Sequence, residues 1–179
     1  MSIYFFVEDI MGNFNFDLKD IPKKEDLLKY SNKNKPLNIN AIQACLYLIR
    51  TTDEILKIVD SQFQKYGVSD GKFSVLMTLY NKDNHQLIPS ELSNELNVTR
   101  ATISGLLDGL EKDMLVERCK HPSDGRMLTI KITEKGVKLM DELCPKHFAL
   151  LSRLLGSLDC ESLNSFTDNL KHIRIGIKE

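Results

Sequence analysis

Arginine side chains are concentrated in one part of the chain, between residues 100 and 126. Of the 24 basic residues, only six are arginines, and three of these are Arg100, Arg118 and Arg126. A guanidinium group can donate two parallel hydrogen bonds to a base edge or a phosphate, and it fits a narrow minor groove. From Arg118 to Lys131, four basic residues stand against a single acid, Asp124. This pattern predicts recognition of nucleic acid.

Other chemistry has little support in the sequence. The chain contains no G-x-S-x-G, H-E-x-x-H, phosphate-loop or dinucleotide-binding motif, so we expect neither an enzyme nor a cofactor. Cys119 and His121 are the nearest pair of metal-ligand types. Two ligands do not make a structural zinc site, and we therefore expect no metal.

The composition of the whole chain is that of a globular protein. Its 179 residues are 42% hydrophobic and 27% charged, which excludes general disorder. The formal net charge of -1 predicts a weak non-specific grip on DNA, but it does not exclude DNA binding, because the basic surplus is local. No apolar run approaches the roughly 20 residues of a membrane span, and the start lacks a secretory signal. Four separated cysteines suit reduced thiols, so we expect a cytoplasmic protein without membrane association.

Two short helices joined by a tight turn are predicted within residues 89–112. Pro89 and Ser90 can open the first helix, and Thr99 can cap the second. Such a pair with a shared apolar face is a helix-turn-helix. The apolar face of the second helix comprises Ile103, Leu106, Leu107 and Leu110. The opposite face carries small or short side chains, which would allow close entry into a major groove, at Ala101, Ser104, Gly105 and Asp108.

A β-hairpin follows the second short helix. Apolar and polar residues alternate strictly in residues 128–133, as expected of a half-buried strand, and residues 115–120 form its predicted partner. Turn-forming residues lie between them at 121–125. We therefore predict a mainly α protein with a small β-hairpin wing, in which residues 67–136 form a winged helix-turn-helix and residues 115–133 its wing.

The segments on either side of the winged helix are predicted to mediate dimerisation. Residues 37–66 form one long amphipathic helix, and the helical period returns in residues 137–179. Residues 1–36 read as an N-terminal arm. Near the C-terminus, apolar residues recur at spacings of three, four, three and four, which is a coiled-coil seam that needs a partner helix. Packing within one subunit is the alternative to a homodimer. The seam residues are Leu163, Phe166, Leu170, Ile173 and Ile177.

These motifs together resemble the MarR family of bacterial transcriptional regulators. The similarity rests on Asn97-Val-Thr-Arg-Ala-Thr-Ile-Ser, on the wing motif Asp124-Gly-Arg126 and on Thr133-Glu-Lys-Gly136, and it extends over about residues 37–178. The arm, the Ile-Pro-Ser-Glu-Leu segment and Cys144-Pro-Lys-His147 are also similar to the EmrR/MprA multidrug-efflux repressor subgroup.

The resemblance implies a ligand-responsive repressor that binds a pseudo-palindromic duplex operator as a homodimer. Each recognition helix would enter a major groove, Arg126 would enter a minor groove, and Asp124 would brace the wing. The implied effector is a small lipophilic or phenolic molecule. The implied DNA-binding residues are Ser90, Thr99, Arg100, Thr102, Ser104, Arg118, Lys120, Ser123, Asp124 and Arg126. Candidate pocket residues are Tyr47, Arg50, Phe73, Met77 and Tyr80.

The chain departs from the family pattern at two places. Met114 stands where the family usually has glycine, so a left-handed turn there would be strained unless Asp113 takes the left-handed position. Gly105 and Gly109 stand where basic side chains are common, which predicts fewer phosphate contacts.

Two alternatives stay open at this point. The winged helix could serve as a protein-interaction module, since the same fold binds proteins elsewhere. Alternatively, Cys45 on the long helix could sense redox state, as in the peroxide-sensing branch of the family. Asp70 occupies the region where that branch has a tyrosine, and a cysteine on an apolar helical face is usually a small core residue.

Overall fold

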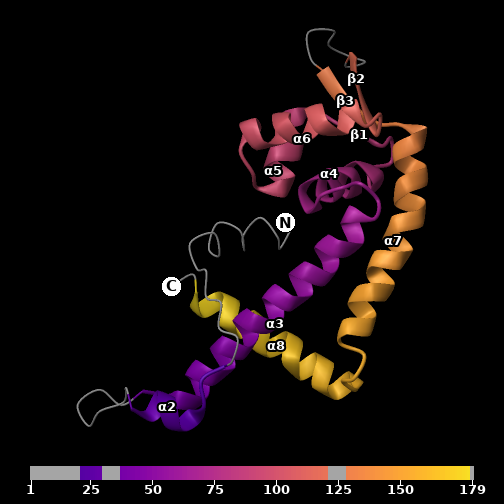
Figure 1. The fold of residues 1–179 in the computed structure, drawn as a ribbon. Coiled ribbons are helices and arrows are strands. Elements are labelled where there is room, and N and C mark those ends of the chain that lie inside the picture. The colour runs from indigo at the N-terminus through magenta and orange to yellow at the C-terminus, as the bar shows by residue number, and fades with distance from the viewer. Residues whose placement is uncertain (1–20, 30–36, 121–127, 178–179) are drawn as a thin grey trace. The chain divides into compact units, whose positions relative to one another are not determined.

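The computed structural model describes residues 21–29, 37–120 and 128–177. It is mainly helical with one small antiparallel sheet (Figure 1), which confirms the predicted winged helix flanked by helices. The chain forms two compact units, Met1–Met140 and Asp141–Glu179, which are described separately. None of the helices in the described part of the chain combines the length and apolar character that a bilayer crossing requires.

The first helices in the described part of this unit are α2 (Lys24–Leu28), α3 (Ile39–Gln64) and α4 (Asp70–Tyr80). Asn38 and Ser69 cap α3 and α4, each side-chain oxygen accepting a hydrogen bond from a backbone N–H in the first turn. Phe63 at the end of α3 stacks on Phe73 of α4, with ring centroids 4.5 Å apart. This aromatic pair anchors the C-terminal end of α3 in the core.

The helix-turn-helix consists of α5 (Pro89–Leu96) and α6 (Arg100–Lys112). Asn97 makes the turn with a left-handed φ of 54°, a conformation that asparagine tolerates better than most residues. Glu91 closes the start of α5 by accepting the backbone N–H of Ile88 at 3.1 Å. Figure 1 shows α4, α5 and α6 gathered beside the strands, and their shared core includes Leu76, Leu79, Leu92, Leu96, Ile103, Leu107 and Leu110.

The sheet has three antiparallel strands in the order β1-β3-β2. The predicted hairpin is present as β2 (Val116–Lys120) and β3 (Leu128–Ile132), paired from Val116 opposite Ile132 to Lys120 opposite Leu128. A third strand, β1 (Gln86–Leu87), pairs with the other edge of β3 and was not predicted. Two residues are too few to show the alternation by which a strand is recognised in a sequence.

The turn after α6 is strained at Met114. Met114 has a φ of 59°, whereas Asp113 has an ordinary φ of -79°, so the alternative that Asp113 takes the left-handed position is wrong. The N–H of Leu115 donates to the carbonyl of Leu110, and the N–H of Met114 donates to that of Glu111. This is a Schellman motif, which satisfies the last carbonyls of the helix and places Met114 where glycine is usual.

Met114→Gly is expected to raise the free energy of unfolding by about 0.5–1 kcal/mol, because glycine adopts the left-handed conformation without a Cβ penalty. The Met114 side chain is 65% exposed, so little packing is lost. Thermal unfolding should show a midpoint a few degrees higher. Met114→Ala is the control, since alanine keeps the Cβ and should not gain. A glycine variant that unfolds earlier than the wild type would contradict this account of the turn.

The junction from the wing to α7 (Glu134–Leu154) explains the Thr-Glu-Lys-Gly motif. Thr133 Oγ1 donates to the Met114 carbonyl at 2.8 Å and accepts the N–H of Gly136 at 3.1 Å. A Cβ on Gly136 would lie only 2.3 Å from the Leu115 carbonyl oxygen. Only glycine therefore allows the first turn of α7 to approach the first wing strand this closely.

The second unit contains the rest of α7 and α8 (Cys160–Gly176). Pro145 lies inside α7, and the helix continues past it. Leu143, His147 and Leu150 are buried, and burial lowers the pKa of His147. By contrast, α8, which is capped by Asp159, has no buried residue in the single chain.

Candidate nucleic-acid interface

The start of α6 presents a mixture of capping and exposed side chains. Thr99 Oγ1 accepts the backbone N–H of Thr102 at 3.1 Å, and the two threonine hydroxyl oxygens are 2.8 Å apart. Their hydroxyls are thus engaged in the helix cap. Arg100 and Ser104 are exposed. Arg100 and Ser104 can therefore reach outward without taking part in the cap.

The outward face of α6 is as small and exposed as predicted. Ala101, Ser104, Gly105 and Asp108 are all exposed, opposite the buried apolar face of the same helix. A Cβ on Gly105 would meet nothing within 4 Å, so the backbone at this point lies open to a partner. A helix surface of this kind can lie close to base edges, because no long side chain holds it away.

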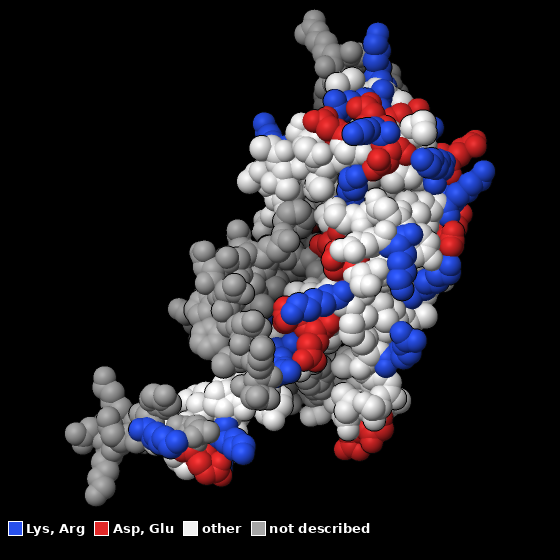
Figure 2. Space-filling view, viewed as in Figure 1, with Lys and Arg blue, Asp and Glu red and all other residues white. Residues whose placement is uncertain are grey.

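Arg118 is committed to the protein rather than free at the wing. Its Nη2 lies 2.5 Å from Asp108 Oδ1 and its Nε lies 3.5 Å from Glu111 Oε2. It therefore ties β2 to the outer side of α6. The surplus of positive charge counted over residues 118–131 is therefore larger than the positive charge available to DNA, because Arg118 is paired. Figure 2 shows acidic and basic side chains intermixed at this end of the molecule rather than a uniform basic patch.

The other predicted DNA-binding residues are placed as follows. Ser90 is half-buried in the first turn of α5, where its carbonyl accepts the Ser93 hydroxyl at 3.0 Å. Lys120 is exposed at the end of β2. Ser123, Asp124 and Arg126 lie outside the described residues, so their roles stay predictions.

A lysine that the sequence did not single out supports the far end of α6. Lys72 of α4 places its Nζ 2.5 Å from Asp113 Oδ2. This hydrogen bond holds the pKa of Asp113 below its usual value, with smaller contributions from the charges of Lys72, Lys112 and Lys135. The ionised carboxylate therefore favours the folded state at neutral pH, and this contribution is lost as the pH falls through the lowered pKa. It is small, because the Asp113 side chain is 40% exposed.

The same lysine changes the interpretation of Gly109. Gly109 is half-buried, and a Cβ there would lie 2.9 Å from Lys72 Cε. Its lack of a side chain therefore gives room to Lys72. A lost phosphate contact therefore stays a prediction for the open Gly105 position, whereas Gly109 lies against Lys72 and does not face outward freely.

Of the five candidate pocket residues, two border one cavity of the described chain and two are in aromatic contacts elsewhere. Phe73 is buried in the core against Phe63, and Tyr80 stacks on His85 with ring centroids 5.8 Å apart. Tyr47 and Arg50 instead border a cavity of about 660 Å³ between α3 and the segment before α2. Its lining comprises Ile21, Pro22, Lys23, Tyr47, Arg50, Thr51 and Glu54, without Met77.

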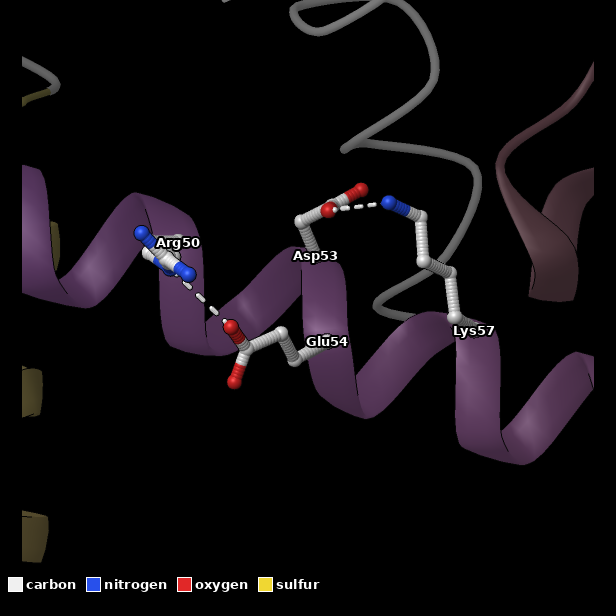
Figure 3. A network of polar contacts seen from close by, with 4 residues as sticks. All are labelled: Arg50, Asp53, Glu54 and Lys57. Atoms are coloured by element: carbon white, nitrogen blue, oxygen red, sulfur yellow. Dashed lines mark hydrogen bonds and ion pairs between the residues drawn. The ribbon is translucent and has the colours of Figure 1, made fainter. Parts of the chain in front are cut away.

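Ion pairs stiffen the part of α3 that borders this cavity. Arg50 Nε lies 3.0 Å from Glu54 Oε1, and Lys57 Nζ lies 2.7 Å from Asp53 Oδ2 (Figure 3). In each pair the two residues are four positions apart, so their side chains lie on the same face of the helix. Each pair adds a few tenths of a kcal/mol to the stability of α3. Arg50 and Glu54 thus bring charge of both signs to the cavity wall.

The cysteines do not assemble a reactive or metal-binding site in the described part of the chain. Cys45 is exposed, so its interpretation as a small core residue is wrong for the single chain. Cys119 is half-buried on β2. Burial, and secondarily Asp141, raises the pKa of Cys144, which keeps this thiol protonated. Among the described residues no group of three metal-ligand side chains is found.

The predicted seam on α8 is apolar and largely uncovered in the single chain. Phe166 is 37%, Ile173 47% and Ile177 64% exposed. Leu163 and Leu170 are half-buried. An apolar helical stripe of this length is unusual on a surface that meets only water.

Comparisons with known proteins agree with this geometry. The model of the MarR family matches residues 68–128. The repressor YetL of Bacillus subtilis is 31% identical over 154 residues, covering 86% of this chain and 92% of YetL. The repressor MprA of Escherichia coli K12 is 27% identical over 135 residues, covering 75% of this chain and 77% of MprA.

Solved structures share the fold. Sco3205 of Streptomyces coelicolor, a MarR family regulator solved in complex with DNA, has a TM-score of 0.69 at 21% identity, covering 80% of this chain and 91% of Sco3205. The MepR–DNA complex of S. aureus has a TM-score of 0.64 at 24% identity, covering 73% of this chain and 96% of MepR. At these identities the structural likeness supports the fold alone.

Proposed function

The chain belongs to the MarR family of winged helix-turn-helix transcriptional regulators, and we propose that it acts as a homodimeric repressor whose hold on DNA is weakened by a small molecule. It is a regulator of transcription rather than an enzyme. Repression is proposed because YetL and MprA are both named repressors.

The observation that carries DNA recognition is the outer face of α6. This face is exposed along its length, has no long side chain between Arg100 and Asp108, and lies beside the wing strands. We propose that α6 enters the major groove, with Arg100 and Ser104 nearest the bases and the wing beside the minor groove. In addition, we propose that Ser90, Thr99, Thr102 and Lys120 contact the phosphate backbone of the DNA.

The experiment that tests this function is selection of duplex DNA fragments by the purified protein, followed by mobility-shift titration of an enriched fragment and of a scrambled one. A repressor of this kind should prefer the enriched fragment by about a thousandfold or more. Equal affinity for both fragments would refute sequence-specific recognition.

The exposed seam of α8 supports a homodimer. We propose that residues 37–66 and 137–179 supply the dimer helices, residues 67–136 the DNA-binding domain, and residues 1–36 an arm. A two-fold dimer would present its two recognition helices to half-sites about 34 Å apart, one turn of DNA, which predicts a pseudo-palindromic operator.

A small lipophilic or phenolic effector would act by favouring a dimer in which the recognition helices have the wrong spacing. The cavity beside Tyr47 and Arg50 offers an aromatic ring, a guanidinium group and about 660 Å³, a volume within the range of small-molecule sites. A multidrug response is supported by the similar fold of MepR, a transcription regulator of the multidrug efflux pump MepA of Staphylococcus aureus. We therefore propose an effector of this class.

Binding to the operator should depend on salt less steeply than in regulators with a basic recognition helix. Each subunit offers few cations at the interface, since Arg118 is paired and Gly105 has no side chain. We expect a log–log slope no steeper than about -5, corresponding to roughly six phosphate contacts per dimer. Titrations from low to moderate salt measure it, and a slope near -9 would contradict the count.

The same titration separates DNA binding from the alternative of a protein-interaction module. A protein-docking surface has no reason to release counterions from duplex DNA, so it would show no binding or no linear salt dependence. We place this alternative second, because it lacks an observation that favours it.

A further inference from the structure

Lys72 forms a long-range contact at the C-terminal end of the recognition helix. It belongs to α4, yet its ammonium group lies 2.5 Å from the carboxylate of Asp113, 41 residues further along the chain. The Lys72 side chain is only 22% exposed and crosses α6 directly over Gly109. A partly buried ammonium group held by one carboxylate is more restricted than a surface lysine.

The carboxylate that Lys72 holds stands at an unfavourable position. Asp113 caps the C-terminal end of α6, where the helix dipole is negative, so its charge needs a nearby cation. The backbone of the same turn is also held, because Lys135 Nζ donates to the Asp113 carbonyl at 2.8 Å. The strained Met114 follows immediately. Three elements thus fix one turn: α4, the end of α6 and the start of α7.

We propose that Lys72 is a positioning residue for DNA binding, which acts through Asp113 to fix the C-terminal end of α6 on α4. This inference rests on the proposed entry of α6 into the major groove. Because the outward face of α6 carries short side chains, its contacts with bases depend on close approach of the backbone. Freeing one end of the helix would therefore lower the specific affinity without removing any group that touches DNA.

A double-mutant cycle with Lys72→Met and Asp113→Asn separates this role from direct contact with a phosphate. If Lys72 positions α6 through Asp113, each single variant should lower the specific affinity about fivefold, as expected for an ion pair of this exposure, and the double variant should be no worse. If Lys72 contacts DNA instead, Asp113→Asn should strengthen binding, because it releases the ammonium group and removes a negative charge. The sign of the Asp113→Asn effect therefore decides.

Gly109→Ala provides an independent test that leaves every charge in place. The new Cβ would lie 2.9 Å from Lys72 Cε, so the end of the lysine side chain that reaches Asp113 has to shift, while alanine should strengthen the helix. We expect a thermal midpoint that is unchanged or a few degrees higher, together with specific affinity lowered about fivefold. If the contact between Lys72 and Asp113 only stabilised the fold, Gly109→Ala would change the affinity for DNA and the thermal midpoint in the same direction. Gly105→Ala, where a Cβ has open space, is the control for the gain in helix stability.

The titrations use the full-length protein and an operator fragment already shown to bind the wild type preferentially over a scrambled duplex. Failure of the wild type to prefer that fragment would refute the proposed function. The role of Lys72 is refuted by different outcomes. It is overturned if the wild type binds specifically and Asp113→Asn binds as tightly or more tightly, or if Gly109→Ala keeps full affinity. Weaker binding by all three variants, with a double variant no worse than either single, would support it.

Discussion

Ile173→Glu is expected to convert the protein to a monomer and to lower its affinity for a two-half-site operator by a factor on the order of 10²–10⁴, the usual loss when two linked sites bind separately. Ile173 is 47% exposed in the single chain and belongs to the α8 seam, between Leu170 and Ile177. In a dimer, a glutamate there would place an unpaired charge in an apolar interface, which costs several kcal/mol. Light scattering after gel filtration gives the mass, and a mobility-shift titration gives the affinity.

The control for this substitution places the same charge elsewhere on α8. Asn164 is exposed and lies about half a turn away from the seam. Asn164→Glu should therefore remain dimeric and bind DNA like the wild type, with circular dichroism confirming that both variants are folded. If Ile173→Glu stays dimeric at micromolar concentration, the seam is not the dimer interface.

Arg126→Ala is expected to lower operator affinity tenfold or more, about 1–3 kcal/mol for each wing, while the dimer and the fold remain intact. The prediction comes from the Asp124-Gly-Arg126 motif, since both residues lie outside the described part of the chain. A cation that enters the minor groove also releases counterions, so the salt slope should become shallower by about one for each subunit. Unchanged affinity in a mobility-shift titration would refute the assignment of the wing.

Arg118 supplies the contrasting case for that measurement. Its guanidinium is bound to Asp108 and Glu111, so Arg118→Ala should weaken binding by loosening the wing and by exposing two carboxylates to DNA. Because Arg118 contacts the protein rather than a phosphate, the salt slope should change less than for Arg126→Ala. Measured together, the two variants distinguish an arginine that touches DNA from one that holds the wing.

Elements with a strong hydrophobic period were predictable from the sequence. The capping residue Thr99 and the periodic apolar faces define α3 and α6 closely, because local hydrogen bonds and burial act over a few residues. The alternation in β3 likewise predicted the hairpin. By contrast, β1 is a strand because it pairs with the edge of β3, and no local sequence pattern indicates such a strand.

Long-range contacts explain why the candidate site was predicted less well than the fold. Charge counting along the wing treated Arg118 as available, but only the folded chain shows that α6 supplies two carboxylates to it. Lys72 and Asp113 are separated by 41 residues, and neither belongs to a recognisable motif. Phe73 was a reasonable pocket candidate by type, yet an aromatic residue on an amphipathic helix is equally suited to the core, where it stacks on Phe63.

The uncovered apolar stripe of α8 has a consequence for how the protein would respond to its own abundance. If that stripe is covered only by a second copy, the folded state of the C-terminal unit is stabilised by mass action, and its resistance to heat rises with protein concentration. Below the dissociation constant of the dimer, the population able to span two half-sites grows with the square of the subunit concentration. Dilution of the protein during cell growth would then lower operator occupancy by a larger factor than it lowers the subunit concentration. Repression would therefore depend steeply on protein concentration even without an effector.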